Sequence, residues 1–206
     1  MVNILPVFYL APIEYYSVLL KSSSVIFEIN EHFEKQTYRN RCEIYGANGK
    51  LKLIIPVKHT GERTLVKDVR IANENNWQKI HWKSIESAYR TSSYFEFYEH
   101  IFVPFYEQKF NFLIDFNIEL QNEILKIMEA EIKIEKTNSY QKNYSDEKDL
   151  RNYFNPKSEI RPVPHSSGNL KYKNYPQVFS DKFGFISNLS ILDLIFNTGP
   201  QTKDYL

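Results

Sequence analysis

The first 29 residues constrain the fold most, because their pattern is that of a strand, a short helix and a second strand. Residues 2–9 form an apolar run, residues 13–22 have helical periodicity, and residues 25–29 spell Val-Ile-Phe-Glu-Ile. Such a βαβ unit has parallel strands. Ligands bind parallel sheets at the carboxyl ends of the strands. We therefore expect a site just beyond Tyr9 and Asn30.

The next segment predicts a hairpin. Residues 41–45 and 50–57 flank Gly46-Ala47-Asn48-Gly49, and an Asn-Gly pair favours a tight turn between strands. A further short strand is expected over residues 66–71. Together with the βαβ unit, the hairpin predicts an α/β fold with a mixed, largely parallel sheet and a mostly helical C-terminal part packed on it.

Later segments are mainly helical in pattern. The expected helices cover residues 77–91 with Asn76 as cap, 112–131, and 190–197 with Asn188 or Ser190 as cap and Gly199 as the stop. The aromatic stretch 94–110 predicts one or two short helices broken near Val103-Pro104, because proline interrupts helical hydrogen bonding. A short helix over residues 146–153 and a strand fragment at residues 178–179 complete the expected elements.

The length of 206 residues predicts a single domain. We divide it into a sheet-forming core over residues 1–72, a helical part over 73–135, a long loop or lid over 136–175, and a C-terminal helix over 176–206 that returns to the site. His165, within the long loop, is expected to be an exposed loop residue.

Charge and cysteine content exclude several classes. The net charge of +1 disfavours a nucleic-acid reader and a polybasic membrane binder. Cys42 is the only cysteine, so no internal disulfide forms, and its strand-like surroundings predict a buried, inert thiol. No secretory signal or membrane span is visible, and a cytoplasmic protein is expected.

Cationic and hydrogen-bonding side chains gather between the second strand and the hairpin. Residues 28–41 include His32, Lys35, Tyr38 and the run Arg39-Asn40-Arg41. No helical or strand periodicity places these groups on one solvated face. A binding site for an anionic group is one interpretation; surface charges, or arginines bonded to backbone carbonyls, are the other.

Four polar residues lie on or beside otherwise apolar helical faces. His81 shares a stripe with Trp77, and Asn117 lies on the buried face of its helix. Asp193 and Asn197 border the apolar face of the last helix. Each is explained either by a hydrogen-bonded core network or by a position in the site.

The chain resembles the WbqC-like family of bacterial proteins from residue 5 to residue 199. The matching segments are Pro6-x-Phe8-Tyr9 with Tyr15, Tyr38-Arg39-Asn40-Arg41, Ile55-Pro56-Val57-Lys58, Lys67-Asp68-Val69, Trp77-x-x-x-His81-Trp82-x-x-Ile85 with Tyr89, Asn117, and Leu189-Ser190-Ile191-Leu192-Asp193-Leu194-Ile195-Phe196-Asn197-x-Gly199. The family is associated with O-antigen and other surface-polysaccharide gene clusters. The resemblance implies a role in modifying sugars or their carriers, by attaching an acyl or aminoacyl group to an amino sugar.

The first hypothesis is a transferase acting on an anionic, sugar-containing small molecule. Cations would clamp the anion, a histidine would be the general base, Asn40 would orient an oxygen, and aromatic rings would pack on the sugar. The predicted catalytic residues are His32, His81 and Asp193. The predicted substrate-binding residues are Tyr9, Lys35, Tyr38, Arg39, Asn40, Arg41, Lys58, Trp82, Tyr89, Asn117 and Asn197. The sequence indicates neither a cofactor nor an oligomeric state.

Two alternatives compete with the transferase. A non-catalytic module would bind a saccharide or an assembly partner through the same aromatic residues. A metal hydrolase would use His32, His81, Asp193 and Glu31, but the chain has no H-E-x-x-H and no C-x-x-C pattern. Contact between either histidine and Arg39 or Arg41 in a closed cleft would favour the enzyme, and histidines packed away from the arginines would favour the binding module.

Overall fold

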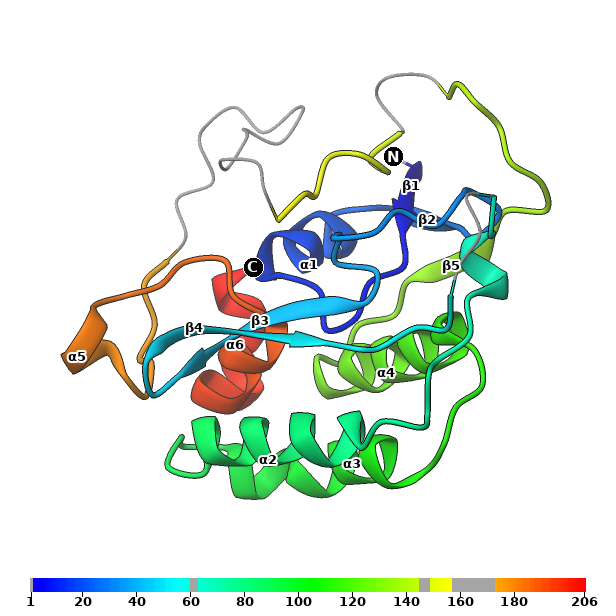
Figure 1. The fold of residues 1–206 in the computed structure, drawn as a ribbon. Helices are drawn as coiled ribbons and strands as arrows, with labels where there is room; N and C mark the ends of the chain where they lie inside the picture. Colours follow the sequence, from blue (N-terminus) through cyan, green and yellow to red (C-terminus); the bar gives the residue numbers. More distant parts are fainter. Residues whose placement is uncertain (1, 60–62, 145–148, 157–172) are drawn as a thin grey trace.

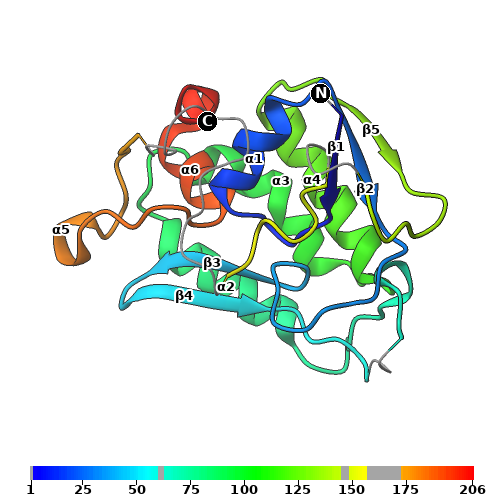
Figure 2. The same cartoon turned by 90° about the horizontal axis from the view of Figure 1, so that it is seen from above.

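The computed structural model describes residues 2–59, 63–144, 149–156 and 173–206. Its larger sheet has three parallel strands in the order β1-β2-β5 (Figures 1 and 2). The strands are β1 (Val2–Pro6), β2 (Ser24–Glu28) and β5 (Lys133–Lys136), and α1 (Ile13–Leu20) connects the first two. Val2 pairs with Ser24 and Pro6 with Glu28. The predicted βαβ unit with parallel strands is therefore confirmed, as is the α/β class.

The hairpin forms a second, separate sheet. Its strands are β3 (Arg41–Gly46) and β4 (Gly49–Ile54), which pair antiparallel from Arg41–Ile54 to Gly46–Gly49. Gly49 has a φ of +96°, a conformation that a residue with a side chain rarely adopts. Cys42 of β3 is buried and free, as predicted.

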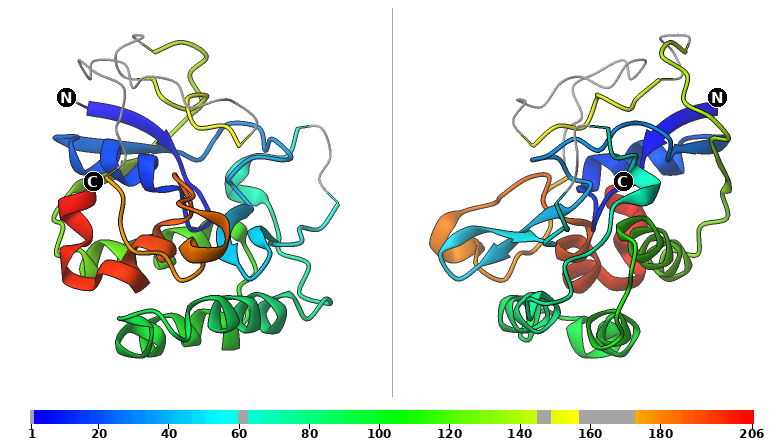
Figure 3. Two further views of the ribbon diagram at one scale, coloured as in Figure 1. Left: turned by 90° about the vertical axis from the view of Figure 1, so that its left-hand side faces the viewer. Right: turned by 45° about the vertical axis from the view of Figure 1, so that its right-hand side comes forward.

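Helices form two layers beneath the parallel sheet in the view of Figure 1. Figures 1 and 3 show α2 and α3 side by side at one end, with α4 and α6 between them and α1. The helices are α2 (Trp77–Tyr89), α3 (Phe95–Glu107), α4 (Leu113–Ile127), α5 (Ser180–Phe183) and α6 (Ile191–Thr198), with 3₁₀ turns η1 (Val66–Asp68) and η2 (Gly199–Tyr205). Buried aromatic residues fill the space between the layers, among them Phe95, Phe102, Phe116 and Phe196.

Two helix predictions were wrong for local reasons. Helix α3 continues through Pro104 without a break. The carbonyl of His100 loses its usual donor there, but both residues are exposed, so water can replace the missing bond. Helix α4 ends at Ile127 rather than near residue 131, because Glu129 takes a φ of +47° and turns the chain into β5.

Other local predictions also need correction. Residues 66–71 form a 3₁₀ turn followed by isolated bridges at Arg70 and Ile71, not a strand. Residues 178–179 form a turn before α5, and Asn76 precedes α2 without a side-chain cap bond.

The chain after β5 was expected to form a long loop. Of the short helix expected over 146–153, residues 149–153 instead form a bridge to Ile4 and a turn. Residues 145–148 and 157–172 lie outside the described residues, and the prediction for His165 lies there too.

The last helix follows its prediction. The Ser190 side chain accepts a hydrogen bond from the backbone N–H of Leu192, which caps α6. Gly199 ends the helix with a φ of +55°. The predicted apolar face of Leu189, Leu192 and Phe196 is fully buried. Cap, face and stop signal agree, so local and tertiary preferences coincide in this segment.

Candidate functional site

A charged cluster lies where the parallel strands end. We call it the edge cluster; it comprises Glu28, Asn30, Glu31, Arg39, Thr137, Asp149 and Arg151. Glu28 and Lys136 are the final residues of β2 and β5. The cluster therefore occupies the carboxyl ends of the strands, where ligands of parallel sheets bind.

Glu28 is the most deeply buried member of the cluster. Its side chain is 0% exposed, and Oε1 accepts hydrogen bonds from the Asn30 backbone N–H and the Thr137 hydroxyl, both at 2.8 Å. The Asn30 side-chain amide donates to the Thr137 carbonyl at 2.7 Å. These bonds join the end of β2 to the chain that follows β5.

Arg151 brings a distant part of the chain to Glu28. Its Nη1 lies 3.5 Å from Glu28 Oε2, and its Nε and Nη2 donate to the two oxygens of Asp149 at 2.9 and 2.6 Å. The guanidinium carbon also lies 5.3 Å and 4.8 Å from the ring centres of Tyr140 and Tyr144. Arg151 was not predicted from the sequence, because it falls in the expected loop, where no periodic pattern marks a buried side chain.

The predicted anion-binding arginine is already paired. Arg39 is 2% exposed; its Nε donates to Glu31 Oε1 at 3.0 Å, and Nη2 contacts the same oxygen. A second carboxylate, that of the exposed Glu34, lies 3.8 Å from Nη1. Burial raises the pKa of the Glu31 carboxyl above its usual value, although Arg39 acts in the opposite direction. Glu31 thus combines a perturbed pKa with a position at the strand ends.

The other residues of the Tyr38–Arg41 run mostly support the backbone. The Asn40 amide donates to the Ile55 carbonyl at 2.9 Å, and the Asn117 amide donates to the Arg39 carbonyl at 2.8 Å. Arg41 is half-buried with an unpartnered Nε. Tyr38 packs edge-on against Phe8. Burial raises the pKa of the Tyr38 hydroxyl, and the nearby carboxylates Glu43 and Glu14 add to that rise.

Three predicted residues lie on the surface. His32 and Lys35 are exposed on the turn that contains Glu31, and His32 forms a backbone bridge to Leu65. Lys58 is exposed and pairs with Glu74 at 3.2 Å. His32 and Lys35 are thus close in sequence to the edge cluster, whereas Lys58 has its own partner.

His81 belongs to a separate, buried network. Its ring is 4% exposed; the Tyr9 hydroxyl lies 3.0 Å from Nδ1 and 2.9 Å from the Tyr106 hydroxyl. Trp77 packs edge-on against the imidazole. Burial lowers the pKa of His81 to about 4, so the ring is neutral near pH 7. The predicted sugar-packing ring of Trp82 is partly buried and packs on Tyr106.

Asp193 is the centre of a third network. The carboxylate is 0% exposed; Oδ1 accepts from the Tyr89 hydroxyl at 2.9 Å, and Oδ2 accepts from the Tyr175 hydroxyl and the Gln177 amide at 2.6 and 2.8 Å. Burial raises the pKa of Asp193, and these three donors partly offset the rise. Asn197 donates to the Asp193 carbonyl at 2.6 Å. The network ties the segment after residue 173 to α6.

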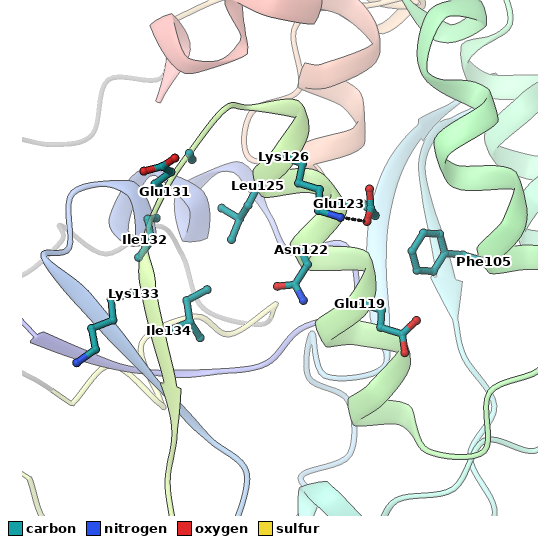
Figure 4. Close-up of a pocket in the computed structure, with 11 residues that line it drawn as sticks. Phe105, Glu119, Asn122, Glu123, Leu125, Lys126, Glu131, Ile132, Lys133 and Ile134 are labelled. Atoms are coloured by element: carbon teal, nitrogen blue, oxygen red, sulfur yellow. Dashed lines mark hydrogen bonds and ion pairs between the residues drawn. The ribbon is translucent and has the colours of Figure 1, made fainter.

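Arg39, His81 and Asp193 thus lie in three networks with separate hydrogen-bond partners. Among the described contacts, neither His32 nor His81 bonds to Arg39 or Arg41. Two surface depressions lie elsewhere. One of about 710 Å³ runs between α4 and the β5 segment (Figure 4), and one of about 540 Å³ lies between the hairpin and α2. Within the described ranges, no three His, Cys, Asp or Glu side chains are placed to hold a metal ion.

These features define an α/β protein with a βαβ core, an adjoining hairpin and a buried charged cluster at its strand ends. The chain belongs to the WbqC-like protein family, whose model matches residues 8–159. It is similar to the uncharacterized protein Rv1507c of Mycobacterium tuberculosis, with 22% identity over 213 residues covering 93% of this chain and 91% of that protein. No solved structure matches the chain significantly. None of the described helices is long and apolar enough to cross a membrane.

Proposed function

We propose that the protein modifies a sugar in bacterial surface-polysaccharide biosynthesis, transferring an acyl or aminoacyl group to the amine of an amino sugar. The edge cluster is the proposed site. The main support for this proposal is the set of buried charges at the carboxyl ends of β1, β2 and β5. One of these groups, Glu31, has a carboxyl pKa that burial raises. Perturbed, buried titratable groups concentrate at functional sites.

The charge balance of the edge cluster favours an amine over an anion as the bound group. Its three carboxylates, Glu28, Glu31 and Asp149, face two guanidiniums, those of Arg39 and Arg151. The formal net charge is therefore −1 when all five are ionised. An added ammonium group would neutralise that excess, whereas an added phosphate or carboxylate would increase it.

Glu31 is the proposed general base. A carboxyl whose pKa is raised by burial is a stronger base than an exposed one. It would first take a proton from the bound ammonium group, which frees the nitrogen lone pair. The amine nitrogen then attacks the donor's carbonyl carbon, and the donor's leaving group departs with the bonding electrons and takes up the second proton from the nitrogen. Arg39, bonded to the same carboxyl, would hold it in place. The exposed His32 on the adjoining turn stays a predicted second base.

Binding of a nucleotide-linked amino sugar tests this proposal. Calorimetry should show tighter binding of the free-amine sugar than of its N-acetylated form. Glu31→Gln should weaken free-amine binding at least tenfold, measured on protein that circular dichroism shows to be folded, because the substitution also takes the carboxylate partner from the buried Arg39. Glu34→Gln, an exposed carboxylate on the same turn, should leave binding within twofold. Equal binding by the wild type and Glu31→Gln, or no binding of any amino sugar, would remove the edge cluster as the site.

The second candidate function is a non-catalytic saccharide- or partner-binding module. One observation favours it: the His81 ring is packed between Tyr9 and Trp77, and it does not contact the predicted arginines. Mass spectrometry of the amino sugar after incubation with the protein and acyl thioesters or aminoacyl donors distinguishes the two functions. Transfer adds the mass of the acyl group to the sugar, whereas a binding module returns it unchanged.

A further inference from the structure

We propose that a second copy of this chain pairs with β5, so that two three-stranded sheets join into one. Strand β5 is the last in the order β1-β2-β5, and no described strand pairs with its outer side (Figure 2). An unpaired strand edge offers a row of backbone donors and acceptors that another strand can use. This inference is independent of the proposed function.

The backbone of β5 determines which residues can pair outward. The Thr137 N–H donates to the Phe27 carbonyl at 3.0 Å, so Thr137 faces β2. Alternate residues of a strand direct their backbone groups to opposite sides. Lys133 and Glu135 therefore face β2 as well, and Ile134 directs its N–H and carbonyl outward.

Two-fold symmetry then leaves few registers. An antiparallel pair centred on Ile134 places its outward N–H and carbonyl opposite those of Ile134 in the second copy. The same register places Lys133 opposite Glu135 of the other copy, and symmetry produces this pair twice. Registers centred on Lys133 or Glu135 would place like charges opposite each other across the two-fold axis. A centre on Lys136 would oppose two lysines.

Charge complementarity supports the Ile134 register. Lys133 and Glu135 are exposed and project from the same face of β5, where their side chains pair at 2.7 Å. Directly opposite residues of an antiparallel pair approach to about 4.5–5.5 Å between Cβ atoms, close enough for opposite charges to attract. Edge lysines ordinarily discourage strand pairing. Here each Lys133 meets a glutamate instead.

The other face of β5 supplies apolar surface for the second copy to cover. Ile132 and Ile134 are partly exposed and line the depression of about 710 Å³ together with Leu125 of α4 (Figure 4). The proposed pairing places Ile134 beside its symmetry mate at this depression. Backbone bonds, two charge pairs and an apolar contact therefore point to one occupant, a second copy of the chain.

The proposal can be tested by measuring the dimer affinity of the wild type and of charge-exchange variants by sedimentation velocity, at protein concentrations of about 1–100 µM. The wild type should dimerise. Lys133→Glu and Glu135→Lys should each weaken the dimer about tenfold or more, because each substitution opposes like charges twice. The double exchange restores opposite charges and should recover the wild-type affinity. Lys79→Glu, an exposed substitution on α2, is the matched control and should leave the affinity unchanged.

Each outcome decides the question, because all three substituted residues are exposed and their replacement should leave the fold intact. A wild type that stays monomeric throughout this range would refute the dimer. A dimer that is insensitive to the single exchanges, or that the double exchange fails to restore, would refute the Ile134-centred pairing.

Discussion

Removal of the Arg151 side chain should be the most damaging single change at the edge cluster. The guanidinium is 5% exposed and lies 3.5 Å from a Glu28 carboxylate that is 0% exposed. It also binds both oxygens of Asp149 and donates to the carbonyls of Gln141 and Lys142 at 2.9 and 3.1 Å. One side chain therefore joins three stretches of chain, namely residues 141–142, residues 149–151 and the end of β2.

The expected magnitude follows from what Arg151→Ala leaves behind. Glu28 would stay buried without its cation, and breaking such a pair costs about 3–5 kcal/mol. Glu28 keeps the donors Asn30 and Thr137, and the freed carbonyls of exposed residues can bind water. We therefore expect a loss at the lower end of the range, roughly 3 kcal/mol in the free energy of unfolding.

Urea denaturation monitored by tryptophan fluorescence measures this loss. Arg90→Ala is the control, because Arg90 is 45% exposed and pairs with the partly exposed Glu86 and Glu99, and surface pairs contribute about 0–1 kcal/mol each. Adding Glu28→Gln to Arg151→Ala should recover part of the loss by removing the unpaired charge. The reasoning fails if Arg151→Ala destabilises the protein no more than Arg90→Ala does.

Three further substitutions have defined outcomes. Burial lowers the pKa of His81 to about 4 in the folded protein, whereas histidine in the unfolded chain gains a proton below about pH 6.5, so the folded state loses stability as the pH falls. His81→Gln should therefore remove up to about 3 kcal/mol of the change in unfolding free energy between pH 7.5 and 4, measured by urea denaturation. An unchanged dependence of the unfolding free energy on pH would contradict this. Asp193→Asn replaces an oxygen that accepts two hydrogen bonds, so we expect a loss of about 2 kcal/mol and faster proteolysis after residue 173; wild-type cleavage rates would exclude a tethering role. Gly199→Ala places a Cβ 2.5 Å from a Tyr94 ring carbon at a φ of +55°, and it should lower the melting temperature by several degrees; an unchanged melting temperature would show that the ring moves freely.

Segments with coincident local signals were predictable from the sequence. The βαβ start combines β-branched runs with a short amphipathic helix, and α6 has both a serine cap and a glycine stop. Strand β5 was not predictable, because Lys133–Lys136 contains a single apolar residue. Residues 133–136 form a strand because they can pair with the edge of β2. This cause lies in the tertiary structure, so the local sequence pattern does not reveal it.

The sequence did contain a sign that Arg39 is paired, namely the acidic residues of the same turn. Residues 28–41 contain the acids Glu28, Glu31 and Glu34 beside Lys35, Arg39 and Arg41, so the stretch is balanced rather than basic. Balance alone does not give partners. Arg39 lies eight positions after Glu31, and only the fold of the turn brings the two side chains together.

The burial of these charges limits what they can be for. Replacing a buried ion pair by apolar residues of similar volume is often neutral or stabilising, so stability alone does not explain why Glu28 and Arg151 are charged. Their location narrows the explanation, since they lie at the strand ends, next to a carboxyl with a raised pKa, and not at random in the core. There Arg39 and Arg151 hold the carboxylates of Glu31 and Asp149 in fixed orientations through hydrogen bonds, and under the proposed function the excess negative charge attracts an ammonium group. The sequence predicted that Arg39 binds an anion of the substrate. In the proposed function, Arg39 instead positions the Glu31 carboxylate, which binds the amine.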